Sequence, residues 1–372
     1  MTNQNKLFLI TSVVESGAFE TLPSTPLMEL ISNDDLVNSK LSFVKDQKIC
    51  VTSEYSIDSV TQRIDDVRRN AIEKLKDKFK FREILAEIYP DYQYKLLKFQ
   101  DIKNIRIDKK FVIKPIRGCF GTAVRIVDSG TNFEILSIEL EAELIKNGKV
   151  YSDYTLSKND FILEQFVEGE EYAIDLFYNS KGEPCIVNLY HHPMPENEAY
   201  LHMAYNSSKK VFDEIYDKVK VFFTNLNKLL NVTNFVLHAE IKLFNENIFP
   251  VEINPMRIGG MGLGNLVYYS LGVNPYTCFI NDCEPNWNEI WQGRDKEVYT
   301  FFIAYNGITK PTNKFKPNRE KLKKQFTEVL HEQPFDYQKQ LTFGIYFLKE
   351  TKENILKLMQ IEFDDYFDEI NC

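Results

Sequence analysis

The chain alternates short apolar runs with polar stretches, and this pattern predicts strands and helices that follow one another closely. Near the N-terminus, residues 6–14 and 48–52 are continuous apolar runs, which are typical of buried parallel strands. Apolar residues recur at helical spacing from Ser59 to Lys80, which predicts a long amphipathic helix. Residues 19–35 hold two prolines and a polar end, so we expect a loop there. The start of the chain is therefore predicted to be α/β.

The rest of the chain continues this alternation. Strands are expected at 111–113, 124–127, around 161 and 172, at 235–243, 248–254, 298–305 and 341–348, and helices at 135–145, 209–230, 319–331 and from 350 onward. We place the strands around 161 and 172 in one small lobe with the strands at 111–127. The last elements predict a small α+β unit at the C-terminus, so the expected fold class is α/β with α+β lobes.

A glycine-bearing turn separates the strands at 111–113 and 124–127. Gly118 and Gly121 would let backbone N–H groups lie close against phosphate oxygens. Lys114 is placed to reach the same phosphates as a point charge. The turn is followed by a strand and lacks a Lys-Ser/Thr pair, which excludes a P-loop and a dinucleotide fingerprint. Taken alone, such a segment is more often an ordinary hairpin than a phosphate site.

A second segment, Phe161 to Val167, is a strand that continues into a short connector before Gly169. Backbone N–H and C=O groups of such a connector can pair with the edge of an adenine ring. The carboxylate of Glu171 can accept hydrogen bonds from ribose hydroxyl groups. A β-turn with solvated glutamates is the alternative interpretation.

The third segment places carboxylates on apolar strands. Glu252 and Asn254 are two residues apart, so they point to the same face of their strand. Glu240 lies on the preceding strand. Hard oxygen ligands suit Mg²⁺, and a carboxylate on an otherwise buried face is costly unless it is paired or coordinated. The alternative is a solvent-facing strand edge.

Together, KPIRGCFG, EQFVEGEE and AEIK…VEINPMRIGG resemble the ATP-grasp superfamily in order and spacing, over roughly residues 76–275. The resemblance implies ATP held between two α+β subdomains, with its phosphates neutralised by lysines and by Mg²⁺ or Mn²⁺. It divides the chain into an N-terminal α/β domain (1–75), an ATP-grasp domain (76–290, with a glycine-loop lobe at about 109–167) and a C-terminal α+β lobe (291–372).

The resemblance also implies roles for individual residues. ATP would contact Lys78, Lys114, Gly118, Gly121, Thr122, Glu164, Gln165, Phe166, Val167 and Glu171, and the metal would be held by Glu240, Glu252 and Asn254. Lys78 is the best match to the family's other ATP lysine because it follows Asp77 ahead of a helix, although Lys74, Lys76 and Lys80 lie nearby.

Two further positions are candidate catalytic residues. Many family members have an arginine two residues after the metal-binding asparagine, whereas Arg257 falls three residues after Asn254. This shift leaves its role in stabilising a reacting carboxylate open. His238 stands where a basic residue often precedes the first metal carboxylate, and a role in orienting phosphate and a purely structural role both remain open.

Two segments are expected to face the substrates. Residues 191–208 form a long loop of the kind that often walls an active site, and His191 and His192 within it could bind a carboxylate. A surface hairpin is the alternative. Gly259 and Gly260 begin a glycine-rich turn ahead of a helix, where free N–H groups favour an anion. We expect this turn to hold the carboxylate that becomes phosphorylated.

Composition narrows the classes of function. A chain of 372 residues with 44% hydrophobic content can bury more than one core. The net charge of −9 argues against a nucleic-acid partner. No apolar run approaches the roughly 20 residues of a membrane span, and the N-terminal apolar run is too short for a signal peptide, so we expect a cytoplasmic protein. Its six cysteines, Cys119 included, lack metal-ligand spacing and are expected to be reduced thiols.

The expected function is an ATP-dependent carboxylate–amine ligase that forms an amide or peptide bond through an acyl phosphate. Its substrates would be a small carboxylate and an amine, most simply amino acids or small peptides, because no biotin-carrier signature and no second ATP unit are visible. Two alternatives stay open: a purine-pathway or carboxylase-like member, and a non-catalytic ATP-binding regulatory protein. A homodimer also remains open, since dimers are the commonest oligomers.

Overall fold

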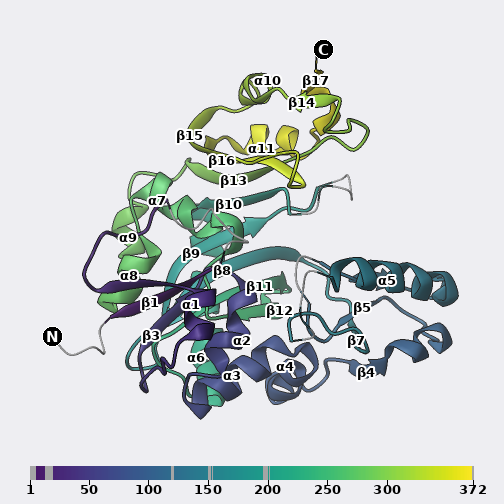
Figure 1. The fold of residues 1–372 in the computed structure, drawn as a ribbon, viewed down its shortest axis with the longest axis vertical. Helices are drawn as coiled ribbons and strands as arrows, with labels where there is room; N and C mark the ends of the chain where they lie inside the picture. The colour runs from purple at the N-terminus through teal and green to yellow at the C-terminus, as the bar shows by residue number, and fades with distance from the viewer. Residues whose placement is uncertain are drawn as a thin grey trace.

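The computed structural model describes residues 6–12, 20–118, 121–149, 152, 154–195, 200 and 202–370. Within these residues an 11-stranded mixed sheet runs through the molecule, and a 4-stranded sheet forms a smaller lobe. Figure 1 shows the long sheet passing from the N-terminal strands at the left to the C-terminal strands at the top, with the small lobe at the right. This architecture confirms the expected fold class, α/β with α+β lobes.

The N-terminal part adds three parallel strands to one edge of the long sheet. Its elements are β1 (Leu7–Thr11), β2 (Met28–Ser32), α1 (Asn33–Asn38), β3 (Lys48–Val51), the 3-10 helix η3 (Glu54–Ser56), α2 (Ile57–Thr61), α3 (Asp66–Lys76) and α4 (Lys78–Leu85). β1 lies between β2 and β3, and β3 meets β11 of the large lobe at the pair Ile49 and Phe235. The expected strands at 6–14 and 48–52 are confirmed as β1 and β3.

Two expectations for this part are wrong. Residues 19–35 contain β2 and α1, because β2 gains its backbone partners from β1 and the side chain of Ser32 caps α1. The helix expected from Ser59 to Lys80 is divided into α2, α3 and α4. Asp65 caps the N-terminus of α3, and Asp77, with extended backbone, ends α3 and caps α4.

The large lobe forms the middle of the long sheet. Its elements are β8 (Glu170–Tyr178), β9 (Pro184–His192), β10 (Ala204–Ser208), α6 (Lys209–Leu230), β11 (Phe235–Phe244) and β12 (Asn247–Pro255). The expected helix at 209–230 is confirmed as α6, which Ser208 caps at its start and left-handed Asn231 ends. The strands expected at 235–243 and 248–254 are confirmed as the hairpin β11–β12.

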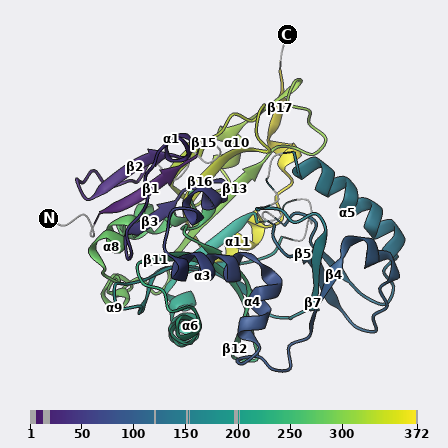
Figure 2. The same cartoon turned by 60° about the horizontal axis from the view of Figure 1, so that its bottom comes forward.

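The small lobe has its own sheet and core. Its elements are β4 (Tyr94–Lys98), the 3-10 helix η4 (Phe99–Asn104), β5 (Phe111–Pro115), β6 (Arg125–Val127), α5 (Phe133–Asn147) and β7 (Asp160–Gln165). The strand order is β4-β7-β5-β6, and α5 packs on it around buried Ile113, Leu140 and Phe161. The strand around 172 belongs to β8 of the long sheet instead, because it pairs with β9 and β11. Figure 2 shows this lobe across the molecule from β1 and β2.

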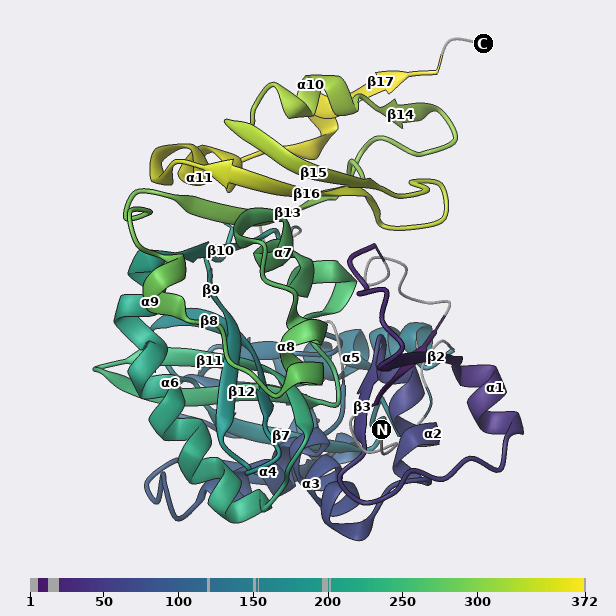
Figure 3. The ribbon, with the colours of Figure 1, turned by 90° about the vertical axis from the view of Figure 1, so that its left-hand side faces the viewer.

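The C-terminal lobe extends the other edge of the long sheet. Its elements are β13 (Val298–Tyr305), β14 (Phe315–Pro317), α10 (Arg319–Lys323), β15 (Glu328–Pro334), β16 (Thr342–Glu350), α11 (Lys352–Leu358), the 3-10 helix η6 (Phe363–Tyr366) and β17 (Phe367–Glu369). The helix expected at 319–331 stops at Lys323, because residues from Glu328 pair with β16 as an edge strand. Figure 3 shows β13, β15 and β16 stacked above the large lobe.

A short helical segment links the large lobe to the C-terminal lobe. It consists of the 3-10 helix η5 (Gly260–Asn265), α7 (Leu266–Leu271), α8 (Pro275–Asn281) and α9 (Trp287–Ile290). The side chains of Thr21 and Asn265 are hydrogen-bonded at 2.6 Å, which ties this segment to the N-terminal part. Within the described residues, no helix has the length and apolar character needed to cross a membrane.

Candidate active site

The hairpin β11–β12 presents the acidic candidates on one face. In its antiparallel register, Glu240 lies opposite Glu252, and His238 lies opposite Asn254. Residues directly opposite each other in an antiparallel pair point to the same side of the sheet. The hairpin therefore brings Glu240, Glu252 and Asn254 together, with His238 Nε2 at 4.0 Å from Glu240 Oε1.

This donor set suits a hard divalent cation. Glu240 and Glu252 provide carboxylate oxygens on the face that also carries Asn254. In the orientation that satisfies both atoms of the Asn254 amide, its nitrogen donates to Glu252 Oε1 at 3.0 Å, so the amide would have to rotate to offer its oxygen to a cation. In the described part of the chain, no group of three or more His, Cys, Asp and Glu side chains is arranged to hold a metal ion. The residues thus fit a cation such as Mg²⁺ that takes its other ligands from water and phosphate, rather than an all-protein cage.

A backbone distortion brings Arg257 back to this face despite its shifted position in the sequence. Met256 adopts a left-handed conformation, with φ of 65°. It is held there by hydrogen bonds from its own N–H to Val236 O (2.8 Å) and from Val51 N–H to its carbonyl (2.7 Å). The extra residue is absorbed in this kink. With the Asn254 amide oriented so that both of its atoms are satisfied, its oxygen accepts from Arg257 Nη2 at 3.2 Å.

Glu54, which the sequence analysis did not single out, lies at the centre of the charged cluster. Its carboxylate is buried, forms an ion pair with Lys76, and lies 3.2 Å from Arg257 Nη2. In the same amide orientation, the Asn254 nitrogen donates to it at 2.6 Å. Burial would raise the pKa of Glu54, but Lys76 and Arg257 outweigh it and lower the pKa to about 2. The sequence did offer one signal for Glu54. It is an acidic residue just after the parallel strand β3, and open parallel sheets bind ligands at the carboxyl ends of their strands.

The two candidate phosphate lysines are buried at the edge of this cluster. Lys78 Nζ lies 3.2 Å from Glu252 Oε2 and 3.5 Å from Gly118 O, so it joins the metal face to the glycine turn. Lys114 Nζ lies 2.7 Å from Glu164 Oε1 and donates to Val251 O at 3.3 Å. Burial lowers the pKa of Lys114.

The carboxylate of Glu164 is shared by two cations. Besides Lys114, Arg82 Nε donates to Glu164 Oε2 at 2.7 Å. The attraction of Arg82 and Lys114 outweighs burial and lowers the pKa of Glu164 to about 2. The side chain of Glu164 is therefore occupied by the protein, and its backbone lies in β7 between β4 and β5.

The expected adenine connector follows Glu164 directly. Gln165 O accepts from the Tyr92 hydroxyl at 2.9 Å, and Val167 O accepts from Lys242 Nζ at 3.1 Å. The same ammonium lies 4.8 Å from the ring centroid of Phe166. These contacts tie the connector to β11, so the strand that carries Glu240 also positions residues 165–167.

Glu171, the expected ribose ligand, is held by a histidine. His192 Nδ1 and Glu171 Oε1 are 3.1 Å apart, and this contact contributes to a lowered pKa of Glu171 against the opposing effect of burial. His191 and His192 lie on β9, and neighbours on a strand point to opposite faces. His191 instead pairs with exposed Glu170. Only His192 is on the side of the site, so the expectation that both histidines bind one substrate is wrong.

The glycine turn of the small lobe is described on either side of residues 119–120, so Cys119 lies outside the described residues. Gly121 has a φ of 65°, a conformation that favours glycine. Thr122 is buried, and its hydroxyl accepts from Asn147 at the end of α5 at 3.2 Å. The turn is thereby fixed to the helix of the small lobe.

The second glycine turn differs from its expected form. The Gly259 N–H donates to Asp175 Oδ1 at 2.7 Å, so it is not free to bind a substrate carboxylate. Gly260 begins a 3-10 segment in which Met261 and Gly262 have positive φ, and α7 begins only at Leu266. The helix expected after the turn is confirmed as α7, which begins at Leu266.

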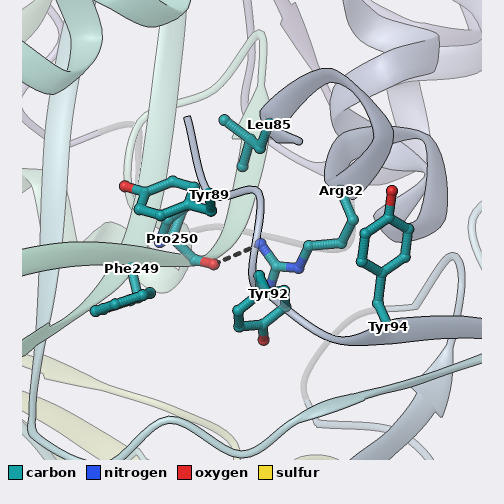
Figure 4. A pocket seen from close by; sticks show the side chains of 7 residues that line it. All are labelled: Arg82, Leu85, Tyr89, Tyr92, Tyr94, Phe249 and Pro250. Atoms are coloured by element: carbon teal, nitrogen blue, oxygen red, sulfur yellow. Dashed lines mark hydrogen bonds between the residues drawn. The ribbon is translucent and has the colours of Figure 1, made fainter. Parts of the chain in front are cut away.

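Two hollows lie away from this cluster. Figure 4 shows a small one beside Arg82, whose guanidinium donates to Pro250 O. Its volume of about 10 Å³ is at the lower limit for a single water molecule. A wider groove follows β4 on the outer edge of the small lobe. Neither hollow contains the candidate catalytic residues.

Comparisons with known proteins bear on the domain and on the fold. Residues 107–265 match the family model of the ATP-grasp domain. An L-amino acid ligase from Bacillus licheniformis has a similar structure, with 17% identity, a TM-score of 0.66 and coverage of 100% of both chains. An N5-carboxyaminoimidazole ribonucleotide synthetase from Thermotoga maritima is 13% identical, with a TM-score of 0.57 and coverage of 99% of each chain. A search of the curated proteins gave no match.

Proposed function

Since this chain carries an ATP-grasp domain and has the ATP-grasp fold, we propose that it is an ATP-dependent ligase that joins a carboxylate to an amine. The observation that carries the proposal is the shared face of β11 and β12. Glu240 and Glu252 lie opposite each other there, and Lys78 lies 3.2 Å from Glu252. This face offers oxygens to a divalent cation and ammonium groups to phosphates, which are the two kinds of charge that phosphoryl transfer requires.

In the proposed first step, an oxygen of the substrate carboxylate attacks the γ-phosphorus of ATP, and ADP leaves. Lys78 and Lys114 would contact phosphate oxygens. Glu240, Glu252 and Asn254 would hold Mg²⁺ or Mn²⁺, which neutralises phosphate charge when bound. In the second step the neutral amine attacks the acyl carbon, the bond from that carbon to the phosphate oxygen breaks, the nitrogen releases a proton to solvent, and the amide remains. Arg257 would stabilise negative charge on the reacting carboxylate.

The small lobe and the start of β8 supply the nucleotide pocket in this proposal. The backbone of residues 164–167 would hold the adenine ring, and Glu171 would accept from the ribose. The glycine turn at Gly118, Gly121 and Thr122 would close over the phosphates and exclude water, which would otherwise hydrolyse the acyl phosphate. We assign these parts to an ATP-grasp unit at 76–290, between units at 1–75 and 291–372.

Amino acids or small peptides are the proposed substrates. This choice is supported by the whole-length likeness to a protein named as an L-amino acid ligase. The likeness to the ribonucleotide synthetase favours a second candidate, a purine-pathway enzyme. Cys50, Cys185, Cys278 and Cys283 are free thiols, which supports the proposal that the protein works in the reducing cytoplasm.

The test is ADP release from ATP with Mg²⁺ in the presence of amino acids and short peptides, offered singly and in pairs. Release that requires a pair, with a condensed product of matching mass, supports the ligase. Release that requires an aminoimidazole ribonucleotide and bicarbonate supports the second candidate. Glu252→Gln is the control, and it should abolish release while leaving the circular dichroism spectrum unchanged. Tight ATP binding with no release under any condition would refute both enzymes.

A further inference from the structure

A fully buried carboxylate lies between the candidate catalytic residues. Asp175 on β8 has 0% exposure. Its Oδ1 accepts from His238 Nδ1 at 2.8 Å and from the Gly259 N–H at 2.7 Å. Its Oδ2 accepts from the Tyr190 hydroxyl at 2.6 Å. One side chain therefore connects β8, β9, β11 and the turn that follows Arg257.

The electrostatics of Asp175 are unusual for a residue that serves stability alone. Among the ion pairs of the described residues, its one partner is His238, and it has no lysine or arginine partner. Burying a carboxylate without a fixed cation costs free energy that hydrogen bonds offset only in part. The presence of a buried carboxylate at this position is more easily explained by the way in which it orients His238 and the turn at Gly259.

The geometry imposed on His238 is specific. Asp175 and His238 are direct partners in the register of β8 and β11. Because a carboxylate oxygen can only accept, His238 Nδ1 carries the proton, and Nε2 is directed toward Glu240 at 4.0 Å. On the other side of β8, the register with β9 is irregular just after Asp175, which is the kind of distortion that re-aims a side chain.

The same oxygen also fixes the turn at Gly259. Arg257 lies two residues before Gly259, and the kink at Met256 directs it toward Glu54 and Asn254. A turn held at Met256 on one side and at Gly259 on the other leaves the backbone at Arg257 little freedom. Asp175 thus couples the position of Arg257 to that of His238.

We propose that Asp175 is a positioning residue that sets His238 and the Arg257 turn relative to each other. This inference rests on the proposed function, in which Arg257 stabilises the reacting carboxylate and Glu240, 4.0 Å from His238 Nε2, holds the cation. Its consequence is that the loss of Asp175 should impair turnover while leaving nucleotide binding intact, because none of its contacts reaches the lysines or the adenine connector. Displacing reacting groups by about 1 Å can cost about 100-fold in rate.

The test compares three variants of the full chain by steady-state kinetics and by calorimetric ATP binding. Asp175→Ala should lower kcat by about 100-fold or more, with the Kd of ATP within about threefold of wild type. Asp175→Asn should keep kcat within about tenfold, because its amide oxygen still accepts from both donors while its nitrogen donates to Tyr190. Tyr190→Phe is the matched control, because it removes the Oδ2 contact and the bond from the hydroxyl to Leu263 O (3.2 Å) but leaves both Oδ1 contacts, and its kcat should stay within about threefold.

A measurement independent of turnover separates failure of this inference from failure of the proposed function. With histidine labelled by ¹⁵N, and its five resonances assigned with the help of His238→Asn, wild type and Asp175→Asn should show His238 protonated at Nδ1. Asp175→Ala should show a mixture of tautomers. If wild type is inactive with every substrate pair, this spectrum still decides whether Asp175 orients His238.

Several outcomes would overturn the inference. One is an Asp175→Ala protein that folds and keeps wild-type kcat, and another is an equal loss in Tyr190→Phe. An unprotonated Nδ1 in wild type would contradict it directly. If Asp175→Ala does not fold, the Asp175→Asn variant decides the question. A loss of kcat above about 100-fold in that variant, with His238 still protonated at Nδ1, would show that the charge of Asp175 matters and not the position that it gives its neighbours.

Discussion

Replacing Glu164 by glutamine tests the electrostatic centre of the small lobe. The carboxylate of Glu164 is 4% exposed and pairs with Arg82 and Lys114, each at 2.7 Å. In Glu164→Gln both cations stay buried without their counterion. Arg82 keeps its bond to Pro250 O, which Figure 4 shows, and Lys114 keeps its bond to Val251 O. We expect the fold to be retained at lower stability.

Two arguments give the same size for the loss. Removing one partner of a buried ion pair costs about 3 to 5 kcal/mol. Independently, the pKa of Glu164 is about 2 against an ordinary value of 4.5. At about 1.36 kcal/mol per pKa unit, that difference corresponds to about 3 kcal/mol in the free energy of unfolding. We therefore expect Glu164→Gln to lower the free energy of unfolding by about 3 kcal/mol.

Urea unfolding followed by far-ultraviolet circular dichroism is the suitable assay. Tryptophan fluorescence would report mainly the large lobe, because Trp287 and Trp291 pack against Phe212 of α6. Asp160→Asn is the matched control, since Asp160 pairs with Lys98 in the same sheet but the two side chains are 30% and 58% exposed. That variant should lose about 1 kcal/mol at most. A Glu164→Gln loss no greater than that of the control would refute the reasoning.

Three further results follow from the same contacts. The pKa of Glu164 is depressed to about 2, so the stability that its ionised carboxylate contributes is complete above its ordinary pKa of 4.5 and is lost as the pH falls toward 2. The urea unfolding curves of wild type and Glu164→Gln should therefore converge in acid. A constant difference down to pH 2 would argue against this. Lys114→Ala should weaken ATP binding by about 1.5 to 3 kcal/mol in calorimetry, and unchanged affinity would remove its phosphate role. Arg257→Ala should lower kcat by about 100-fold with ATP affinity retained, and a wild-type rate would show that the kink at Met256 does not bring it into the reaction.

Local patterns predicted much of the fold and the shared face of Glu252 and Asn254. The helix at 209–230 has matching bounds in the structure because its signals are local: an amphipathic period, Ser208 as cap and Asn231 in a left-handed conformation. The two-residue spacing of Glu252 and Asn254 placed both on one face, as the hairpin has them. The breaks at Asp65 and Asp77 were also local cap signals, which the apolar spacing of residues 59–80 concealed.

Other features depend on partners far away in the chain. Residues 328–334 form a strand because β16 offers them an edge, and β2 forms because β1 does the same. The use of the Gly259 N–H by Asp175, 84 positions earlier in the chain, could not be read from the glycines themselves. Hydrogen-bond partners of this kind are set by how strands and turns pack.

By itself, the sequence determined the order of the elements, the three motifs, and the face shared by Glu252 and Asn254, because helical and strand periodicities depend on neighbours along the chain. Only the tertiary structure decided that Arg257 reaches the site, since the kink at Met256 is held by Val236 and Val51 from two other strands. It also brought Glu54 into contact with Arg257, and Asp175 into contact with His238 and Gly259. Burial and ion pairing arise from packing between segments distant in sequence, and no local pattern encodes them.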